Sequence, residues 1–323
     1  MAEYKAIRGH TIRTIAGDPS PLVVGDIWYS STTKKIRGAK LPAGTWATGG
    51  NVNTGGQSGG GCGLQTAAIF VGRYTNLGNL TNVELYDGTS WTESPASHSV
   101  VGREHAAVGT QTAAIKFGGK TPPNRFANAE TWNGSTWTEV GDMNTARSHH
   151  GASGGPTGVT GALCISGYST AAVTIVEEWN GTSWTEIADV SHGVDGASAF
   201  GTTTAAIFVG GPPAECESWN GTSWTEVSNL VTAGRTGFGA SGIQTDGLIS
   251  GGNASPHNYC EQWDGSSWTE VADLPSARAY DQSAAGNIGT KAVVSFGGGA
   301  GAPYPVATEE WDAAVTAANV TVS

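Results

Sequence analysis

The stretch Glu130-Thr131-Trp132-Asn133-Gly134-Ser135-Thr136-Trp137-Thr138-Glu139 decides the fold of this 323-residue chain, because near copies of it recur. The copies begin at Glu84, Glu177, Glu217 and Glu261, and Glu309-Glu310-Trp311-Asp312 is a partial one. The first aromatic residues of the copies are spaced by 46, 47, 40, 44 and 48 residues, at Tyr86, Trp132, Trp179, Trp219, Trp263 and Trp311. This period is typical of a four-stranded propeller blade and is too long for a leucine-rich or ankyrin repeat.

Each copy has the pattern of a β-hairpin. The Asn-Gly or Asp-Gly pair between the two aromatic residues favours a tight turn, because both residues tolerate positive φ. If Asn133–Thr136 forms the loop, Trp132 and Trp137 become cross-strand partners, whereas a two-residue loop would shift that pairing. Upstream of every hairpin lies a short apolar run ending in glycine, at 67–72, 113–119, 162–167, 205–211, 247–252 and 292–298. We interpret these runs as inner strands, where small residues let neighbouring blades approach, each preceded by one more strand.

The number of strands leaves one place in the ring to fill. Six repeats supply a first, second and third strand, but only five supply a complete fourth strand, at Trp91, Trp137, Trp184, Trp224 and Trp268. We favour Gly44-Thr45-Trp46 as the sixth, because an N-terminal strand paired with the last blade would remove an exposed sheet edge. The alternative is the tail Val315–Ser323. The prediction is an all-β, six-bladed propeller over residues 44–323, with an N-terminal anchor segment over residues 1–43.

Composition excludes several other classes of protein. The chain has 49 Gly and 12 Trp, and only 13% of its residues are charged, which argues against a helical bundle and against disorder. No apolar run approaches the length of a membrane span, and the N-terminus lacks the apolar core of a signal peptide. Residues 1–40 hold seven of the 16 basic and three of the 27 acidic residues, a net charge of +4 that leaves −15 for the rest. We therefore expect a basic foot and an acidic body, with no membrane insertion and no nucleic-acid partner.

The four cysteines form no C-x-x-C pair. Cys216 and Cys260 occupy equivalent places in neighbouring repeats, which are too far apart for a disulfide in such a fold. We expect Cys62, Cys164, Cys216 and Cys260 to be reduced and buried, without a zinc site.

The repeat resembles the kelch family, which shows Gly-Gly after the second strand, an aromatic residue before a turn and a Trp several residues later. Gly118-Gly119, Trp132 and Trp137 occupy these places in one repeat, while Gly72-Arg73 and Gly167-Tyr168 depart from the pattern. The phrases T-Q-T-A-A-I and E-x-W-N-G-T-S-W-T-E look like those of kelch-like proteins of marine tailed bacteriophages. The segment Gly25–Arg37 resembles a hairpin of phage virion proteins. The resemblance implies a structural protein of the virion, made in the host cytoplasm.

One face of the expected propeller carries uneven loops and is the candidate binding face. Four arginines near the starts of first strands could form a basic ring there that grips an acidic glycan or a protein, surrounded by aromatic residues. Alternatively, each arginine pairs with a repeated Glu, such as Glu130 or Glu261, and braces adjacent blades; we favour this interpretation. The candidate residues of this face are Arg103, Arg147, Arg235, Arg278, Tyr74, Phe126, Tyr168, Tyr259 and Tyr304.

The sequence gives little support to an enzyme. A kelch-type oxidase needs copper ligands, but six histidines lie in different repeats without a ligand pattern, at His98, His105, His149, His150, His192 and His257. A sialidase-like Asp-box needs Asp five residues before Trp, and Asp87 stands four before Trp91. The repeated acidic pairs, such as Glu84 and Glu93, indicate solvated strand faces rather than a calcium site. We expect no catalytic residues, no metal and no cofactor.

The sequence thus predicts a non-enzymatic virion protein, a tail fibre, an appendage or a capsid decoration. Its basic segment would bind other virion proteins through residues 1–40, with Lys5, Arg8, Arg13, Lys34, Lys35 and Arg37 as anchor residues. The propeller would contact a protein or the host surface, and homo-oligomerisation in the particle is compatible with this role. The alternatives are a glycan-binding recognition module and, less favoured, a kelch-type oxidase or sialidase-like hydrolase.

Overall fold

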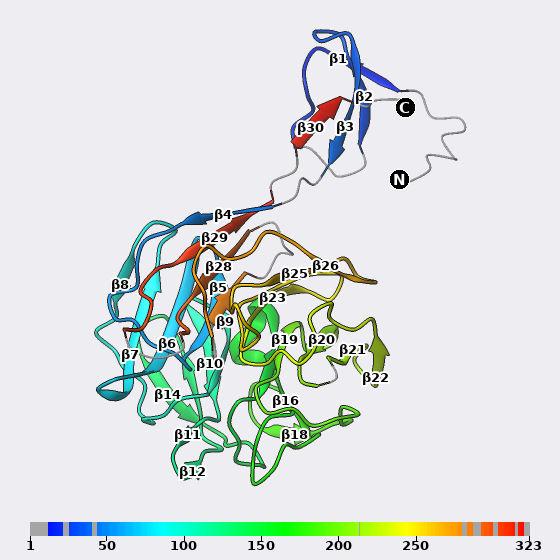
Figure 1. The fold of residues 1–323 in the computed structure, drawn as a ribbon. Coiled ribbons are helices and arrows are strands. Elements are labelled where there is room, and N and C mark those ends of the chain that lie inside the picture. The colour runs from blue at the N-terminus through cyan, green and yellow to red at the C-terminus, as the bar shows by residue number, and fades with distance from the viewer. Residues whose placement is uncertain are drawn as a thin grey trace. The chain divides into compact units, whose positions relative to one another are not determined.

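Two compact units make up the chain in the computed structural model (Figure 1). The larger unit spans Thr45–Asp312, and the smaller one combines Met1–Gly44 with Ala313–Ser323. The structure describes residues 12–21, 26–40, 44–212, 214–279, 283–286, 292–299, 303–313 and 316–319.

The described residues of the larger unit form six four-stranded antiparallel sheets, which we number as blades 1 to 6. Blade 1 contains β5 (Gly60–Leu64), β6 (Ala67–Thr75), β7 (Gly78–Tyr86) and β8 (Trp91–Glu93). Blade 2 contains β9 (Ala106–Thr110), β10 (Ala113–Phe117), β13 (Ala129–Trp132) and β14 (Trp137–Val140). Blade 3 contains β15 (Gly151–Ser153), β16 (Ala162–Ile165), β17 (Val176–Trp179) and β18 (Trp184–Glu186).

Blades 4 to 6 repeat this order of strands. Blade 4 contains β19 (Ser198–Gly201), β20 (Ala206–Val209), β21 (Cys216–Trp219) and β22 (Trp224–Val227). Blade 5 contains β23 (Gly239–Ile243), β24 (Asp246–Ser250), β25 (Cys260–Trp263) and β26 (Trp268–Glu270). Blade 6 contains β27 (Ser283–Ala285), β28 (Ala292–Phe296), β29 (Glu309–Asp312) and β4 (Thr45–Thr48). A two-stranded ribbon, β11 (Lys120–Thr121) and β12 (Asn124–Arg125), extends the loop between β10 and β13.

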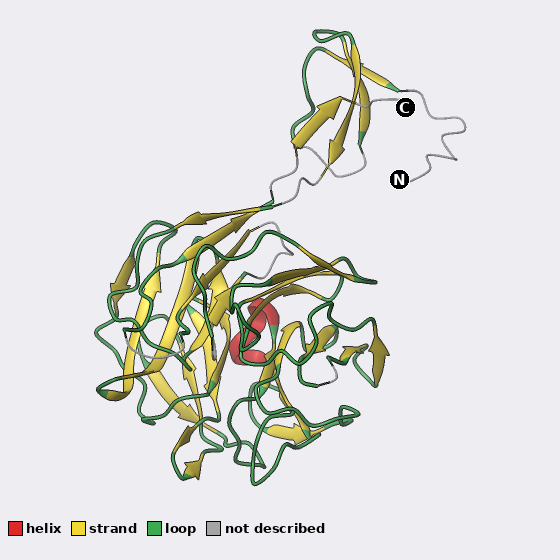
Figure 2. Ribbon diagram, in the orientation of Figure 1, coloured by secondary structure: helices red, strands yellow, loops and turns green. Residues whose placement is uncertain are grey.

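The innermost strands close the blades into a ring. Each of these strands contacts the next, in the order β5, β9, β15, β19, β23 and β27, and β27 contacts β5. Figure 2 shows the strands of the blades in yellow. The all-β propeller class predicted from the sequence is therefore confirmed. Among the described residues the helical content is one short 3₁₀ helix, η1 (Gly155–Thr160), and none of their helices is long and apolar enough to cross a membrane.

The repeated hairpin has the four-residue loop. Trp132 pairs with Trp137 across the strands, and their ring centroids are 5.3 Å apart. Gly134 has a φ of +92°, and Asn133 Oδ1 accepts hydrogen bonds from the backbone N–H groups of Ser135 and Thr136. This turn chemistry explains why Asn or Asp is followed by Gly in each complete repeat. The buried Trp132 donates its indole N–H to the carbonyl of Gln111 at 2.8 Å.

The ring closes through the N-terminal strand β4. Trp46 pairs with Trp311 of β29, and the indole N–H of Trp46 donates to the carbonyl of Ala272 in blade 5 at 2.9 Å. Because β4 occupies the edge of β29, the tail cannot pair there, and β30 (Thr316–Asn319) pairs with the smaller unit instead. The predicted propeller boundary at Ser323 is therefore wrong, since the larger unit ends at Asp312.

This closure predicts opposite results for two variants. Trp46→Ala should lower the free energy of unfolding of the propeller by about 2 kcal/mol, because it removes a half-buried ring packed on Trp311. Deleting residues 316–323 should change the stability of the propeller by less than about 0.5 kcal/mol. Urea unfolding of both variants checks this, and a large loss in the tail deletion would contradict the closure by β4.

The smaller unit is a four-stranded sheet of its own in the order β1-β2-β3-β30. Its strands are β1 (Arg13–Ile15), β2 (Ile27–Ser30), β3 (Lys35–Lys40) and β30. Strands β2 and β3 form a hairpin within the predicted anchor, and Trp28 on β2 is buried. Of the predicted anchor residues, Arg13, Lys34, Lys35 and Arg37 lie in this unit, Arg37 pairing with Asp18 at 3.0 Å. Lys5 and Arg8 lie outside the described residues.

All four cysteines are free and buried, as predicted. Burial raises the pKa of the Cys164, Cys216 and Cys260 thiols to about 12 and also raises that of Cys62. A thiol with so high a pKa is not a thiolate at neutral pH, so these side chains act as small core residues.

Candidate functional site

The repeated glutamate on the third strand of each blade is buried. Its carboxylate faces a cation or an imidazole, and in blades 1 to 5 it also accepts backbone N–H groups of the segment that enters the blade. The six residues are Glu84, Glu130, Glu177, Glu217, Glu261 and Glu309. The interpretation of these glutamates as solvated is therefore wrong. Each lies two residues before a buried aromatic residue and so shares its face of the strand.

Three of the predicted binding arginines fill these carboxylate sites. Arg147 contacts Glu177 at 2.8 Å, Arg235 contacts Glu261 at 2.8 Å and Arg278 contacts Glu309 at 3.1 Å. All three are buried, so they offer no surface to a ligand, and the prediction of a basic ring is wrong for them. Burial lowers the pKa of Arg235 and of Arg278, and the paired carboxylate opposes that shift.

These arginines brace adjacent blades, as the favoured interpretation held. The backbone of Arg147 belongs with blade 2, since its N–H donates to the carbonyl of Phe126 and its carbonyl accepts from Gly119. Its guanidinium reaches blade 3, donating to Glu177 and to the carbonyl of Ile175. One residue thus bonds to two blades, which ties the loop of one to the third strand of the next.

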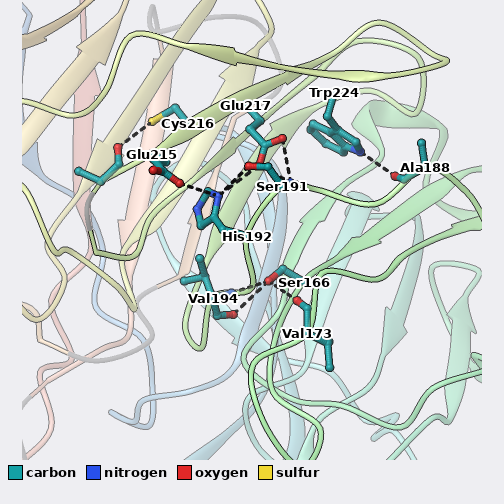
Figure 3. Close-up of polar contacts among 11 residues, drawn as sticks. Ser166, Val173, Ala188, Ser191, His192, Val194, Glu215, Cys216, Glu217 and Trp224 are labelled. Carbon is teal, nitrogen blue, oxygen red and sulfur yellow. Dashed lines mark hydrogen bonds and ion pairs between the residues drawn. The ribbon is translucent and has the colours of Figure 1, made fainter.

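The other three blades use a different partner. Arg73, at the place where the repeat departs from Gly-Gly, contacts Glu84 at 2.7 Å, and Lys116 of β10 contacts Glu130 at 3.4 Å. In blade 4, Nδ1 of His192 lies 3.3 Å from Glu217 and 3.1 Å from Glu215, with Ser191 also bonded to Glu217 (Figure 3). The sequence reasoning missed Arg73 and Lys116, although both are charged residues inside otherwise apolar strands.

Arg103 differs from the other predicted arginines. It remains partly exposed, its guanidinium lies over the ring of Tyr74 at 4.4 Å, and Tyr74 contacts Tyr304 edge to face at 6.4 Å. Arg125 lies over Tyr168 in the same way, at 4.4 Å. The structure therefore brings four of the predicted face residues into two arginine–tyrosine clusters, with Arg125 as an addition to them.

Two predicted residues are positioned through their backbones. Phe126 donates to Gly119 and accepts from Arg147, and the carbonyl of Tyr259 accepts from Arg235 and Gly251. Both side chains are half-buried. They belong to the loops that carry the braces and do not join the arginine–tyrosine clusters.

A cavity of about 120 Å³ lies where the first strands of the blades converge. Glu104 and His149 line it, and they are linked by a 3.3 Å contact between Glu104 Oε1 and His149 Nε2. Lys120 approaches Glu104 at 2.5 Å, Arg103 approaches it at 3.4 Å, and the other imidazole nitrogen of His149 lies 2.8 Å from Asp195. We call this set the mouth cluster: Arg103, Glu104, Lys120, His149 and Asp195.

The mouth cluster does not have the geometry of a metal centre. The two carboxylates contact opposite nitrogens of the His149 ring, so they do not converge on one point. Throughout the described ranges, no group of three His, Cys, Asp or Glu side chains is arranged to hold a metal ion.

Three further histidines are buried at the seams between blades. Burial lowers the pKa of His98 and of His150 to about 3, and that of His105 well below its usual value. The ring of His150 stacks on Phe117, and His98 contacts His105. These side chains are therefore neutral at physiological pH and serve packing.

Comparison with known proteins supports the fold and leaves the activity unassigned. No family model matches the chain, and no curated protein matches it. A solved structure titled "Structure of YjhT" superposes with a TM-score of 0.63 at 14% identity, covering 83% of this chain and 99% of the other. The chain has a β-propeller fold. At this level of identity the similarity to YjhT extends to the fold alone.

Proposed function

We propose that this chain is a non-enzymatic display protein of a phage particle, in which the smaller unit binds other virion proteins and the propeller contacts an outside partner. The observation that carries the proposal is the course of the two chain ends. Strands β4 and β29 are paired, so both ends leave the propeller side by side, at Thr45 and Asp312. Both then enter the same second sheet, where β3 pairs with β30.

Two adjacent chain connections to a separate sheet are what we expect of a propeller that is displayed by an anchoring unit. A ring whose first and last strands are paired needs no further chain to complete it. The second sheet also has a buried aromatic residue of its own, Trp28. The resemblance of the repeat to kelch-like proteins of marine tailed phages, and of residues 25–37 to a virion hairpin, supports a phage particle as the setting.

Truncation tests the division of roles. A chain of residues 44–313 should fold as a propeller with the melting temperature of the full chain, because it keeps β4 and every blade. It should be incorporated into particles at least about tenfold less than the full chain, as measured by quantitative blotting of purified virions.

A charge variant separates anchoring from unfolding. Lys34→Gln/Lys35→Gln changes the exposed turn of the β2–β3 hairpin and should reduce incorporation without changing the melting temperature. Glu226→Gln/Glu270→Gln, two exposed sites on the propeller, is the matched control and should be incorporated normally. Full incorporation of residues 44–313 would contradict the proposal.

A further inference from the structure

The accessible cations of the described propeller are concentrated in one place. Nine basic residues follow residue 40, and one of them, Lys291, lies outside the described residues. Five of the others are buried in the carboxylate sites: Arg73, Lys116, Arg147, Arg235 and Arg278. The remaining three are Arg103, Lys120 and Arg125, and backbone pairing brings them together, since Lys120 pairs with Arg125 and with Arg103.

This basic spot adjoins the central cavity. Arg103 and Lys120 contact Glu104, which lines the cavity together with His149. In a body with a net charge of −15, these three cations outnumber the Glu104 carboxylate that contacts two of them, and the local excess of positive charge attracts anions. The cavity of about 120 Å³ is smaller than a typical drug site and suits one small polar group.

The backbone at the mouth indicates that its side chains have a role. Ser58, Glu104, His149, Gly196 and Gly237 occupy equivalent positions in blades 1 to 5, and all have positive φ. The backbone N–H groups of the last four of these residues each donate to the carbonyl of the equivalent residue in the preceding blade, at 2.7 to 3.0 Å. Blades 4 and 5 use glycine here, which adopts this conformation freely, whereas Glu104 and His149 adopt it at φ of +60° and +54° at a cost in free energy.

Retaining two strained charged or titratable residues at a cavity mouth is typical of a functional constraint. Their side chains belong to a continuous series of contacts. Arg103 and Lys120 contact Glu104, Glu104 contacts His149, and His149 contacts Asp195. Arg103 also lies over the ring of Tyr74, which contacts Tyr304. These contacts therefore bring cations, carboxylates and aromatic rings together in one continuous cluster.

We infer that the mouth cluster and its flanking tyrosines bind an acidic sugar residue of a polysaccharide. Arg103, Lys120 and Arg125 would pair with the carboxylate of the sugar, since charged hydrogen bonds to carboxylates are strong. Glu104, His149 and Asp195 would bond its hydroxyl groups, and Tyr74 with Tyr304 would pack on its apolar face. This inference rests on the proposed outward role of the propeller, and it identifies the chemistry of the partner.

Binding of soluble oligosaccharides to the purified full chain tests the inference, independently of particles. A panel of oligosaccharides ending in hexuronate or sialate, each beside its neutral counterpart, should contain an acidic member that binds at least about tenfold more tightly than its counterpart. Raising the salt from 50 mM to 500 mM should weaken that binding, because the carboxylate pairs at the mouth are solvent-accessible.

Variants assign the binding to the mouth. Arg103→Gln/Lys120→Gln should reduce the affinity at least tenfold, whereas Lys34→Gln/Lys35→Gln, with the same loss of charge in the smaller unit, should not. His149→Gly should keep the melting temperature, because glycine suits its backbone, and weaken binding about fivefold. His257→Gly makes the same change at another histidine of positive φ, which does not line the cavity, and should leave the affinity unchanged.

The opposing results are specific. The inference is overturned if no acidic sugar binds more tightly than its neutral counterpart, if a poly-glutamate peptide binds more tightly than every sugar, or if Arg103→Gln/Lys120→Gln binds normally. If the full chain is incorporated into particles but binds no acidic sugar, this inference is rejected and the proposed function is kept. Sugar binding by a chain that is not a component of particles would reject the proposed setting and keep the site.

Discussion

Arg235→Met should destabilise the propeller by about 3–5 kcal/mol, one of the two largest effects we expect. The substitution keeps the length of the side chain but leaves the Glu261 carboxylate buried without its cation, and breaking a buried pair on one side costs this much. It also removes the hydrogen bonds that the same guanidinium donates to the carbonyls of Gly251 and Tyr259. Urea unfolding monitored by tryptophan fluorescence measures the loss.

A double-mutant cycle separates the pair from its surroundings. Glu261→Leu alone should cost a similar amount, because the guanidinium loses its anion and the N–H groups of Val231 and Thr232 lose their acceptor. Arg235→Met/Glu261→Leu should be less destabilised than the sum of the single variants by at least about 2 kcal/mol. Additive losses would mean that the pair is not coupled.

The matched control for this cycle is a glutamate on the neighbouring strand β26. Glu270 faces Glu261 in the β25–β26 register but is exposed. Glu270→Leu should therefore stay within about 0.5 kcal/mol of the parent chain. Two glutamates of one repeated phrase thus differ in effect because one lies in the interior and the other on the outer edge.

The sequence predicted the ring because its evidence is local and repeated. An Asn-Gly pair between two tryptophans specifies a hairpin wherever it occurs, and the spacing of the copies sets the size of a blade. The burial of the glutamates could have been predicted from the same pattern, since Glu130 and Trp132 are two residues apart on one strand and share a face. The charge of Glu130 favoured a solvated interpretation, but its partner Lys116 made burial feasible.

The mouth cluster was not predictable in the same way. His149 meets Glu104 and Asp195 only because three loops from different blades converge at the axis, and no spacing along the chain encodes that distance. Arg103 resembled Arg147, Arg235 and Arg278 in its place in the repeat, yet it lies outside the carboxylate site because Lys116 already occupies the one in blade 2. The favoured closure by β4 was correct, but the tail was still assigned to the propeller, because no pattern in the sequence showed that β30 pairs with β3.

The second large effect we expect is acid destabilisation that begins above the usual range of carboxylates. His98 and His150 have pKa values lowered to about 3 and His105 one lowered well below its usual value, first by burial. Lys116 lowers the pKa of His98 and His105 further, and Arg147 lowers that of His150. The unfolded chain takes up protons at these residues near pH 6.5, whereas the folded chain does not.

The direction of the pH effect on stability follows from this difference in proton uptake between the unfolded and the folded chain. Stability is fully present above about pH 6.5 and falls as the pH drops from there toward about 3, by about 1.4 kcal/mol per pH unit for each histidine and so by about 4 kcal/mol per unit for the three. Glu130, whose pKa is lowered by Lys116 and two backbone N–H groups against the effect of burial, does not add to this slope above pH 5. For a domain stable by roughly 5–15 kcal/mol, unfolding between about pH 3 and 5.5 follows.

Urea midpoints at pH 7.5, 6.5 and 5.5 measure this slope. His150→Gln, which cannot titrate, should reduce the slope between pH 6.5 and 5.5 by about a third, whatever its effect on stability at pH 7.5. If that variant does not fold, histidine NMR resonances of the parent chain provide the same test, since those of His98, His105 and His150 should not shift between pH 8 and 5. A slope near zero between pH 6.5 and 5.5 would show that these side chains accept protons in the folded ring, which their packing against Phe117, Trp137 and one another does not permit.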